Sequence, residues 1–156
     1  MASFVKGPNL RTPFGRNEYL RSTQDKKTES YTVAADSVPA VEIDGAPGQK
    51  VLQTGTAMAK ITSGLDEGKV GPVDANATDG RQTAANIVGL NDTFLPWQLM
   101  ERDVEISVVY ECTAVQAWCL EYVDDGTASN TSVLAPLINA TADEMRGKKF
   151  LDIMFA

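Results

Sequence analysis

An alternation of apolar and polar residues between positions 104 and 112 constrains the fold more than any other feature of this sequence. Successive side chains of a strand point to opposite faces, so a period of two predicts a strand with one buried face. Only Val109 interrupts the pattern. The apolar face comprises Val104, Ile106, Val108, Tyr110 and Cys112, and the polar face comprises Glu105, Ser107 and Glu111. Such a strand needs partner strands, so the chain must build a sheet.

The rest of the sequence after residue 31 reads as shorter strands separated by turns. Strand patterns occupy residues 38–43, 50–62, 83–90 and 115–123, with turn signals at 44–48, 63–64, 79–80 and 124–126. One short helix is expected at 141–146, where Thr141 could cap its start and Glu144 follows three residues later. We therefore predict a mainly β, β-rich α+β domain over residues 32–156, with one or two short helices. A chain of 156 residues suits one such core.

Charge separates an N-terminal arm, residues 1–31, from this domain. The arm carries six basic and three acidic side chains, a net charge of +3, whereas residues 32–156 carry eight basic and eighteen acidic side chains, a net charge of −10. The arm has no regular period, and it contains Gly7, Pro8, Pro13 and Gly15, so we expect it to be extended and flexible. Its widely spaced aromatic residues are typical of a segment that docks into a partner, although an inert tail remains an open alternative.

Composition argues against most kinds of catalysis and several kinds of binding. The chain has no histidine, which removes histidine-based triads, dyads and metal sites. Its net charge of −7 disfavours binding to nucleic acid, and it has no apolar run long enough to span a membrane. The adjacent acids Asp124 and Asp125 are interpreted as part of a turn. We expect no enzymatic activity, no cofactor and no metal, and we expect Cys112 and Cys119 to be reduced, buried thiols.

Four segments in the middle of the chain resemble the head-decoration proteins of tailed bacteriophages, the family typified by the lambda decoration protein. In that family a strand with a leading glycine is followed by a Thr-Asp-Gly turn, a strand of small residues and a charged, valine-rich strand. The corresponding segments are Gly55–Ile61, Thr78-Asp79-Gly80, Ala84–Leu90 and Val104–Tyr110. The resemblance covers about half of the chain, and the long connector Asn91–Arg102 departs from it.

The resemblance implies a small β-barrel or β-tulip-like body that acts as a structural protein. Such a protein is made in the host cytoplasm and located on the outer capsid surface of the virion, as a homotrimer at three-fold positions that cements neighbouring major capsid subunits. The N-terminal arm would bind the major capsid protein by adding a strand to it, with aromatic anchors and basic contacts. The expected capsid-binding residues are Phe4, Lys6, Arg11, Phe14, Arg16, Tyr19 and Arg21.

A second hypothesis is a trimeric β-rich tail, fibre or glycan-binding adhesion module. Its candidate residues are the two tryptophans, Trp97 and Trp118, since aromatic rings contact sugars and anchor interfaces. Trp118 lies in a strand pattern, which favours a core position or a subunit contact. Trp97 follows a proline in the connector and is the better candidate for an exposed interface.

Overall fold

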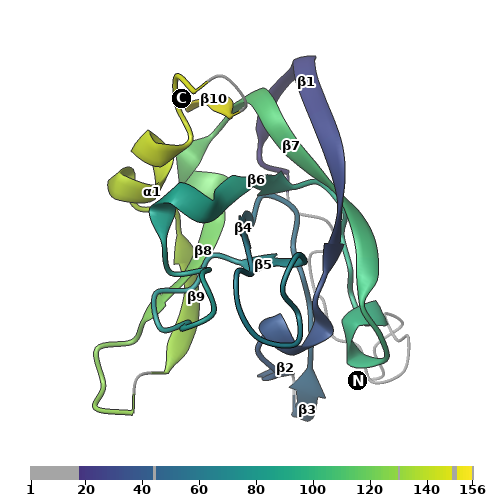
Figure 1. The fold of residues 1–156 in the computed structure, drawn as a ribbon. Coiled ribbons are helices and arrows are strands. Elements are labelled where there is room, and N and C mark those ends of the chain that lie inside the picture. The colour runs from purple at the N-terminus through teal and green to yellow at the C-terminus, as the bar shows by residue number, and fades with distance from the viewer. Residues whose placement is uncertain (1–17, 44, 130, 149–150, 156) are drawn as a thin grey trace.

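The computed structural model describes residues 18–43, 45–129, 131–148 and 151–155, and it is mainly β, as predicted. Ten strands and one α-helix are assigned within these ranges, together with four short 3-10 helices (Figure 1). The strands are β1 (Leu20–Val33), β2 (Val41–Ile43), β3 (Ala46–Gln49), β4 (Ala57–Lys60), β5 (Val70–Pro72), β6 (Ile87–Asn91), β7 (Val104–Ala114), β8 (Leu120–Asp124), β9 (Ser132–Pro136) and β10 (Asp152–Phe155). The helices are η1 (Ala35–Ser37), η2 (Ala84–Asn86), η3 (Gln98–Met100), η4 (Gln116–Trp118) and α1 (Asn139–Glu144).

Five strands close into a barrel in the order β1-β5-β4-β6-β7, and β7 pairs back onto β1. The β1–β7 ladder is antiparallel and runs from Leu20 opposite Ala114 to Val33 opposite Val104. By contrast, β1 meets β5 through a single parallel pair, Val33 and Val70. Figure 1 shows β1 and β7 as a long ribbon along one side of the barrel. Closure therefore depends chiefly on β7.

The predicted strand at 104–112 is confirmed as β7, and three residues of its expected apolar face, Ile106, Val108 and Cys112, are buried. Val109, which breaks the alternation, is also fully buried. It packs on the opposite side of the sheet, in a second apolar cluster. The pairing with β1 skips Tyr110 between Val109 and Glu111, so β7 carries a bulge at this point.

Two apolar clusters explain why both faces of the barrel wall are buried. The barrel interior is filled by residues from all five strands, among them Val33, Met58, Val70 and Val108. The second cluster lies outside the wall, beneath α1 and the end of the β8–β9 hairpin, and β10, which pairs with β7 in parallel, contributes Ile153 to it. On β4, Met58 belongs to the interior cluster, whereas Ala57 and Ala59 belong to the outer one. Small residues at the outer positions let these elements approach closely.

The structure corrects the boundary of the predicted arm. Residues 20–31 form most of β1 and therefore belong to the barrel. Most of the side chains between Arg21 and Thr32 are exposed, so this strand shows no apolar alternation. Its backbone hydrogen bonds to β7 hold it in place, and these cannot be read from a local pattern.

The helix is also shifted relative to its prediction, because α1 spans Asn139–Glu144 and Ile138 occupies the position before its first turn. Thr141 therefore lies inside the helix and does not cap it. Its hydroxyl donates to Glu121 Oε2 at 2.8 Å, and the Ile138 amide donates to Glu121 Oε1 at 2.8 Å. The buried carboxylate of Glu121 on β8 thus holds the first turn of α1 against the hairpin, although α1 has no capping side chain.

Gly89 provides a test of the barrel wall. It has a φ of 144° and lies at a bulge of β6, where the pairing with β4 skips Val88. A Cβ atom at this position would overlap the carbonyl oxygen of Val109 on β7. We expect Gly89→Ala to lower the free energy of unfolding by roughly 2 to 5 kcal/mol, from backbone strain and overpacking together. Chemical denaturation measures this change.

Gly64 is the matched control, because it also has a positive φ, 89°, yet no atom lies within 4 Å of a Cβ built on it. Gly64→Ala should cost only about 1 kcal/mol, the strain term alone. Equal losses for the two variants would contradict the close approach of β6 and β7.

Candidate functional site

Five of the predicted capsid-binding residues lie outside the described residues: Phe4, Lys6, Arg11, Phe14 and Arg16. The sixth, Arg21, is exposed near the start of β1. Residues 1–17 contain three basic side chains and no acidic one, whereas residues 18–156 contain eleven basic and twenty-one acidic side chains, a net charge of −10. Residues 18–31 carry three basic and three acidic side chains, so the positive charge that the arm was predicted to carry resides in residues 1–17.

Tyr19 is not a docking anchor, and this prediction is wrong. Its side chain is 1% exposed, and its hydroxyl donates to Asp92 Oδ1 at 2.8 Å. The ammonium group of Lys26 contacts the other oxygen of Asp92 at 3.0 Å. The ring lies against Gly55, where a Cβ atom would come within 2.7 Å of Tyr19 Cβ. Tyr19 therefore fixes the start of β1 to the body.

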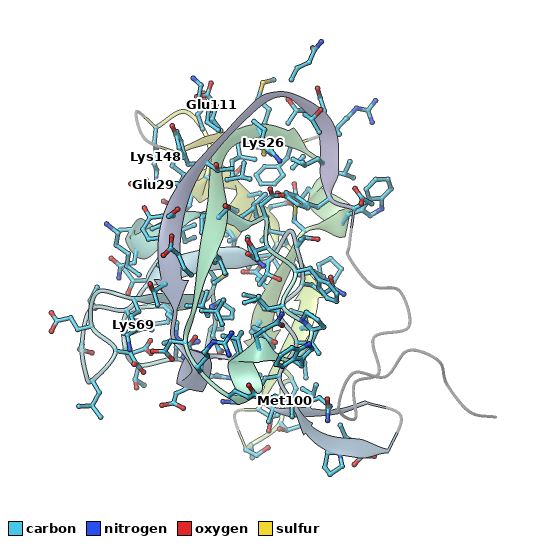
Figure 2. All side chains as sticks on the ribbon, turned by 90° about the vertical axis from the view of Figure 1, so that its right-hand side faces the viewer. Lys26, Glu29, Lys69, Met100, Glu111 and Lys148 are labelled. Carbon is cyan, nitrogen blue, oxygen red and sulfur yellow. The ribbon has the colours of Figure 1, made fainter. Side chains whose placement is uncertain are left out.

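The two tryptophans lie near opposite ends of β7, because Trp97 precedes η3 and Trp118 ends η4. The eleven residues of β7 between them span roughly 30 Å. Figure 2 shows the same separation, with Met100 of η3 at one end of the ribbon and Glu111 towards the other. Trp97 is half-buried, whereas Trp118 is 53% exposed. Trp118 is thus not a core residue, and one compact patch cannot include both rings.

The β8–β9 hairpin presents an outer strand. Along one edge, β8 pairs with β9 from Leu120 opposite Pro136 to Asp124 opposite Ser132. Along the other edge, the amides of Leu120 and Tyr122 donate to the carbonyl oxygens of Gly55 and Val73 at 2.9 Å each. Within the described part of the chain, β9 pairs with no strand other than β8.

Apolar side chains gather on this outer strand and beside it. Leu134 and Pro136 share one face of the hairpin, since their partners Tyr122 and Leu120 are two residues apart. Trp118 and Ile138 lie directly beyond the Leu120–Pro136 pair, at the same end of the hairpin. Leu134 is 44% exposed and Ile138 is 50% exposed. We name these residues the edge patch: Trp118, Leu134, Pro136 and Ile138.

Polar contacts attach the hairpin firmly to the barrel. The Ser132 hydroxyl donates to Asp74 Oδ1 at 2.5 Å, and the Asn76 backbone amide donates to the same oxygen at 2.9 Å. At the other end, the buried carboxylate of Glu121 accepts the two hydrogen bonds from Ile138 and Thr141 described above. The edge patch therefore stands on a fixed support.

An open groove of about 400 Å³ lies elsewhere, between β1 and the region where β4 and β6 end. Glu29, Tyr31, Lys60 and Lys148 line it, together with apolar residues of β6. The Tyr31 hydroxyl donates to Glu29 Oε2 at 3.2 Å, and burial, followed by the charge of Glu29, raises the pKa of Tyr31. Lys148 is paired with Glu144 at 2.7 Å. Charges of both signs therefore meet in this groove.

Two groups of ion pairs outside the groove, around Lys69 and Arg81, support loops. Lys69 contacts Asp66 at 2.9 Å and Asp103 at 2.5 Å, and Asp103 also accepts the Ala35 amide at 2.8 Å. The Ala35 amide, followed by Lys69, lowers the pKa of Asp103. Arg81 is nearly buried and binds Asp79 of the Thr-Asp-Gly turn at 3.0 Å. In this protein the Asp79 carboxylate therefore has a structural role, because it binds the Arg81 guanidinium group.

Comparisons of the chain with family models, with curated proteins and with solved structures find no match. Among the residues that the structure describes, no three acidic, cysteine or histidine side chains are grouped so that they could hold a metal ion. Within the same ranges, no helix is long and apolar enough to cross a membrane.

The two cysteines, predicted to be reduced and buried, are free and buried in the outer cluster. Burial raises the pKa of both thiols to about 12, and the charge of Asp92 adds to this for Cys112. At pH 8 only about one thiol in ten thousand would then be the reactive thiolate. We expect neither cysteine to react with a thiol reagent in the native protein and both to react in denaturant. Rapid modification without denaturant would contradict their burial.

Proposed function

We propose that this chain is a structural protein of a tailed bacteriophage head. It binds the outside of the icosahedral shell as a homotrimer and cements neighbouring major capsid subunits. Three of the four segments that carry the resemblance overlap β4, β6 and β7, which are adjacent in the barrel. The fourth contributes Asp79, which binds Arg81 beside the same barrel. The segments that suggested the family are thus neighbours in space, which supports the proposal.

The observation that carries the proposal is the division of charge at Tyr19. Residues 1–17 have a charge of +3, and the rest of the chain has a charge of −10. Tyr19 is locked into the body through Asp92 and Gly55, so the basic segment is joined to a fixed point. A basic segment on an acidic body favours contact with an acidic surface and disfavours self-binding of whole bodies through charge.

The proposed mechanism assigns separate tasks to the two parts of the chain. Phe4 and Phe14 fill apolar pockets of the major capsid protein, while Lys6, Arg11 and Arg16 contact its acidic surface. The backbone of this segment adds a strand to an exposed sheet edge of the shell. Bound copies then stabilise the closed shell by mass action, because opening the shell requires their contacts to break.

Deletion of residues 1–17 tests this mechanism. The cut must precede Tyr19, because removal of residues 1–31 would also remove most of β1. We expect the shortened chain to keep its melting temperature, since β1 and the Tyr19–Asp92 contact remain. Its affinity for empty capsids should fall at least 100-fold, as measured by co-sedimentation.

A charge-reversal pair separates the basic contacts from a general effect of charge. Lys6, Arg11 and Arg16 changed to Glu should weaken capsid binding, and more strongly at low salt than at high salt. The matched control changes Lys27, Lys60 and Arg102, three basic residues of the body, to Glu, with the same change in net charge. Equal losses for the two triple variants, or full capsid binding by the shortened chain, would contradict the assignment.

The adhesion hypothesis is tested in the same preparation. Trp118 is exposed, and an exposed indole ring can stack on a sugar. Titration with a glycan panel, followed by tryptophan fluorescence, should leave the spectrum unchanged if the chain is a capsid protein. A saturable change that Trp118→Ala abolishes would favour the adhesion module instead.

A further inference from the structure

We propose that the edge patch is the contact through which copies of this chain associate with each other. The inference deepens the proposed function, on which it rests only for the expectation that copies associate. It commits to a second copy of the chain as the occupant of Trp118, Leu134, Pro136 and Ile138. The reasons are the charge, the area and the backbone of the β8–β9 hairpin.

Charge is the first reason. The chain has a net charge of −7, so two copies repel each other over most of their surface. No basic residue occurs between Arg102 and Arg146, and residues 115–138 contain only three acids. Of these, Glu121 is buried against α1, and Asp124 and Asp125 lie at the turn end of the hairpin, away from Ile138. The two acids of α1, Asp143 and Glu144, are paired with Arg146 and Lys148. The edge patch is therefore a surface where two identical acidic chains can meet without bringing negative side chains face to face.

The area of the edge patch suits a contact of this kind. Trp118, Leu134 and Ile138 are 53%, 44% and 50% exposed, and Pro136 is exposed as well. The patch can therefore form the apolar centre of an interface, part of the ~800 Å² that each partner gives to a stable contact. Interfaces between identical subunits are the ones with the most apolar cores. An exposed tryptophan beside two branched aliphatic side chains is a typical centre for such an interface.

The backbone of β9 indicates how the contact is made. The amide of Leu137 donates to Cys119, and that of Asp125 donates to Thr131, so odd-numbered residues of β9 face β8. Ser132, Leu134 and Pro136 therefore direct their backbone outward. Pro136 has no amide hydrogen, so a strand added here could gain only two amide donors from β9. Side-chain packing must supply most of the contact.

The hairpin is also held in position before association. Asp74 binds Ser132 at one end, and Glu121 binds Ile138 and Thr141 at the other. Little conformational freedom is then lost when a second copy packs against Leu134 and Ile138. Pre-organisation of this kind leaves more of the contact energy for affinity.

Sedimentation equilibrium of the full chain without capsids tests the inference. The wild-type chain should sediment above the 16.8 kDa of one copy, and Leu134→Asp should weaken association at least tenfold. The matched control is Leu65→Asp, because Leu65 is a fully exposed leucine in the 61–69 turn, far from β9 in the sequence. It makes the same chemical change and should leave association unaltered.

Thiol protection gives a second measurement that does not depend on a disruptive substitution. Leu134→Cys places a reactive thiol on the edge patch, while the native Cys112 and Cys119 remain buried. Its alkylation rate should fall at least fivefold as the protein concentration rises through the association range. The rate for Leu65→Cys should stay constant.

Three results would overturn the inference: a wild-type chain that stays monomeric at millimolar concentration, association that survives Leu134→Asp, or protection at position 134 that does not change with concentration. The last would indicate that another segment of the same chain covers the patch. The capsid-binding assay tests a different claim. If the wild-type chain fails to bind capsids, that result contradicts the proposed function and leaves the association of copies through the edge patch unaffected.

Discussion

The ladder between β1 and β7 is the interaction on which the rest of the structure depends. It joins residues 20–33 to residues 104–114 along most of the length of both strands. On its other edge β1 is paired with β5 at one residue alone, so the ladder to β7 is what holds β1 in the barrel. Each backbone hydrogen bond contributes only about 1 kcal/mol net, so the length of the ladder matters. The ladder also fixes Tyr19, whose carbonyl oxygen accepts the Val115 amide at 2.9 Å. The end of the basic segment is thereby tied to the barrel.

Burial of the barrel wall on both faces follows from this closure. When β1 and β7 are paired, Met58 and Val108 point into the barrel interior. Ala57, Leu90 and Val109 of β4, β6 and β7 then face outward and form an apolar outer surface. That outer surface is covered by α1 and by the end of the β8–β9 hairpin, in which β8 lies against the barrel and β9 is outermost. The edge patch therefore exists because this hairpin ends with β9.

The distribution of charge complements this architecture. The three charged side chains before Glu18 are all basic, acidic side chains outnumber basic ones in the rest of the chain, and the edge patch has neither. Under the proposed function, residues 1–17 provide the attachment to the shell and the edge patch provides the contact between copies. The open groove beside β1, by contrast, contains internally paired charges.

The sequence by itself determined the mainly β class, the strand β7, the charge division and the buried state of both cysteines. Each depends on local alternation or on composition, which tertiary contacts did not override. Only the tertiary structure decided that residues 20–31 form a strand, because their side chains are mostly exposed and their pairing partners lie about eighty residues away. It also decided the burial of Tyr19 and the exposure of Trp118. Tyr19 contacts Asp92 and Gly55 within the body, whereas Trp118 lies at the end of η4, where it is half-exposed. Aromatic residues suit either environment, and long-range packing selects between them.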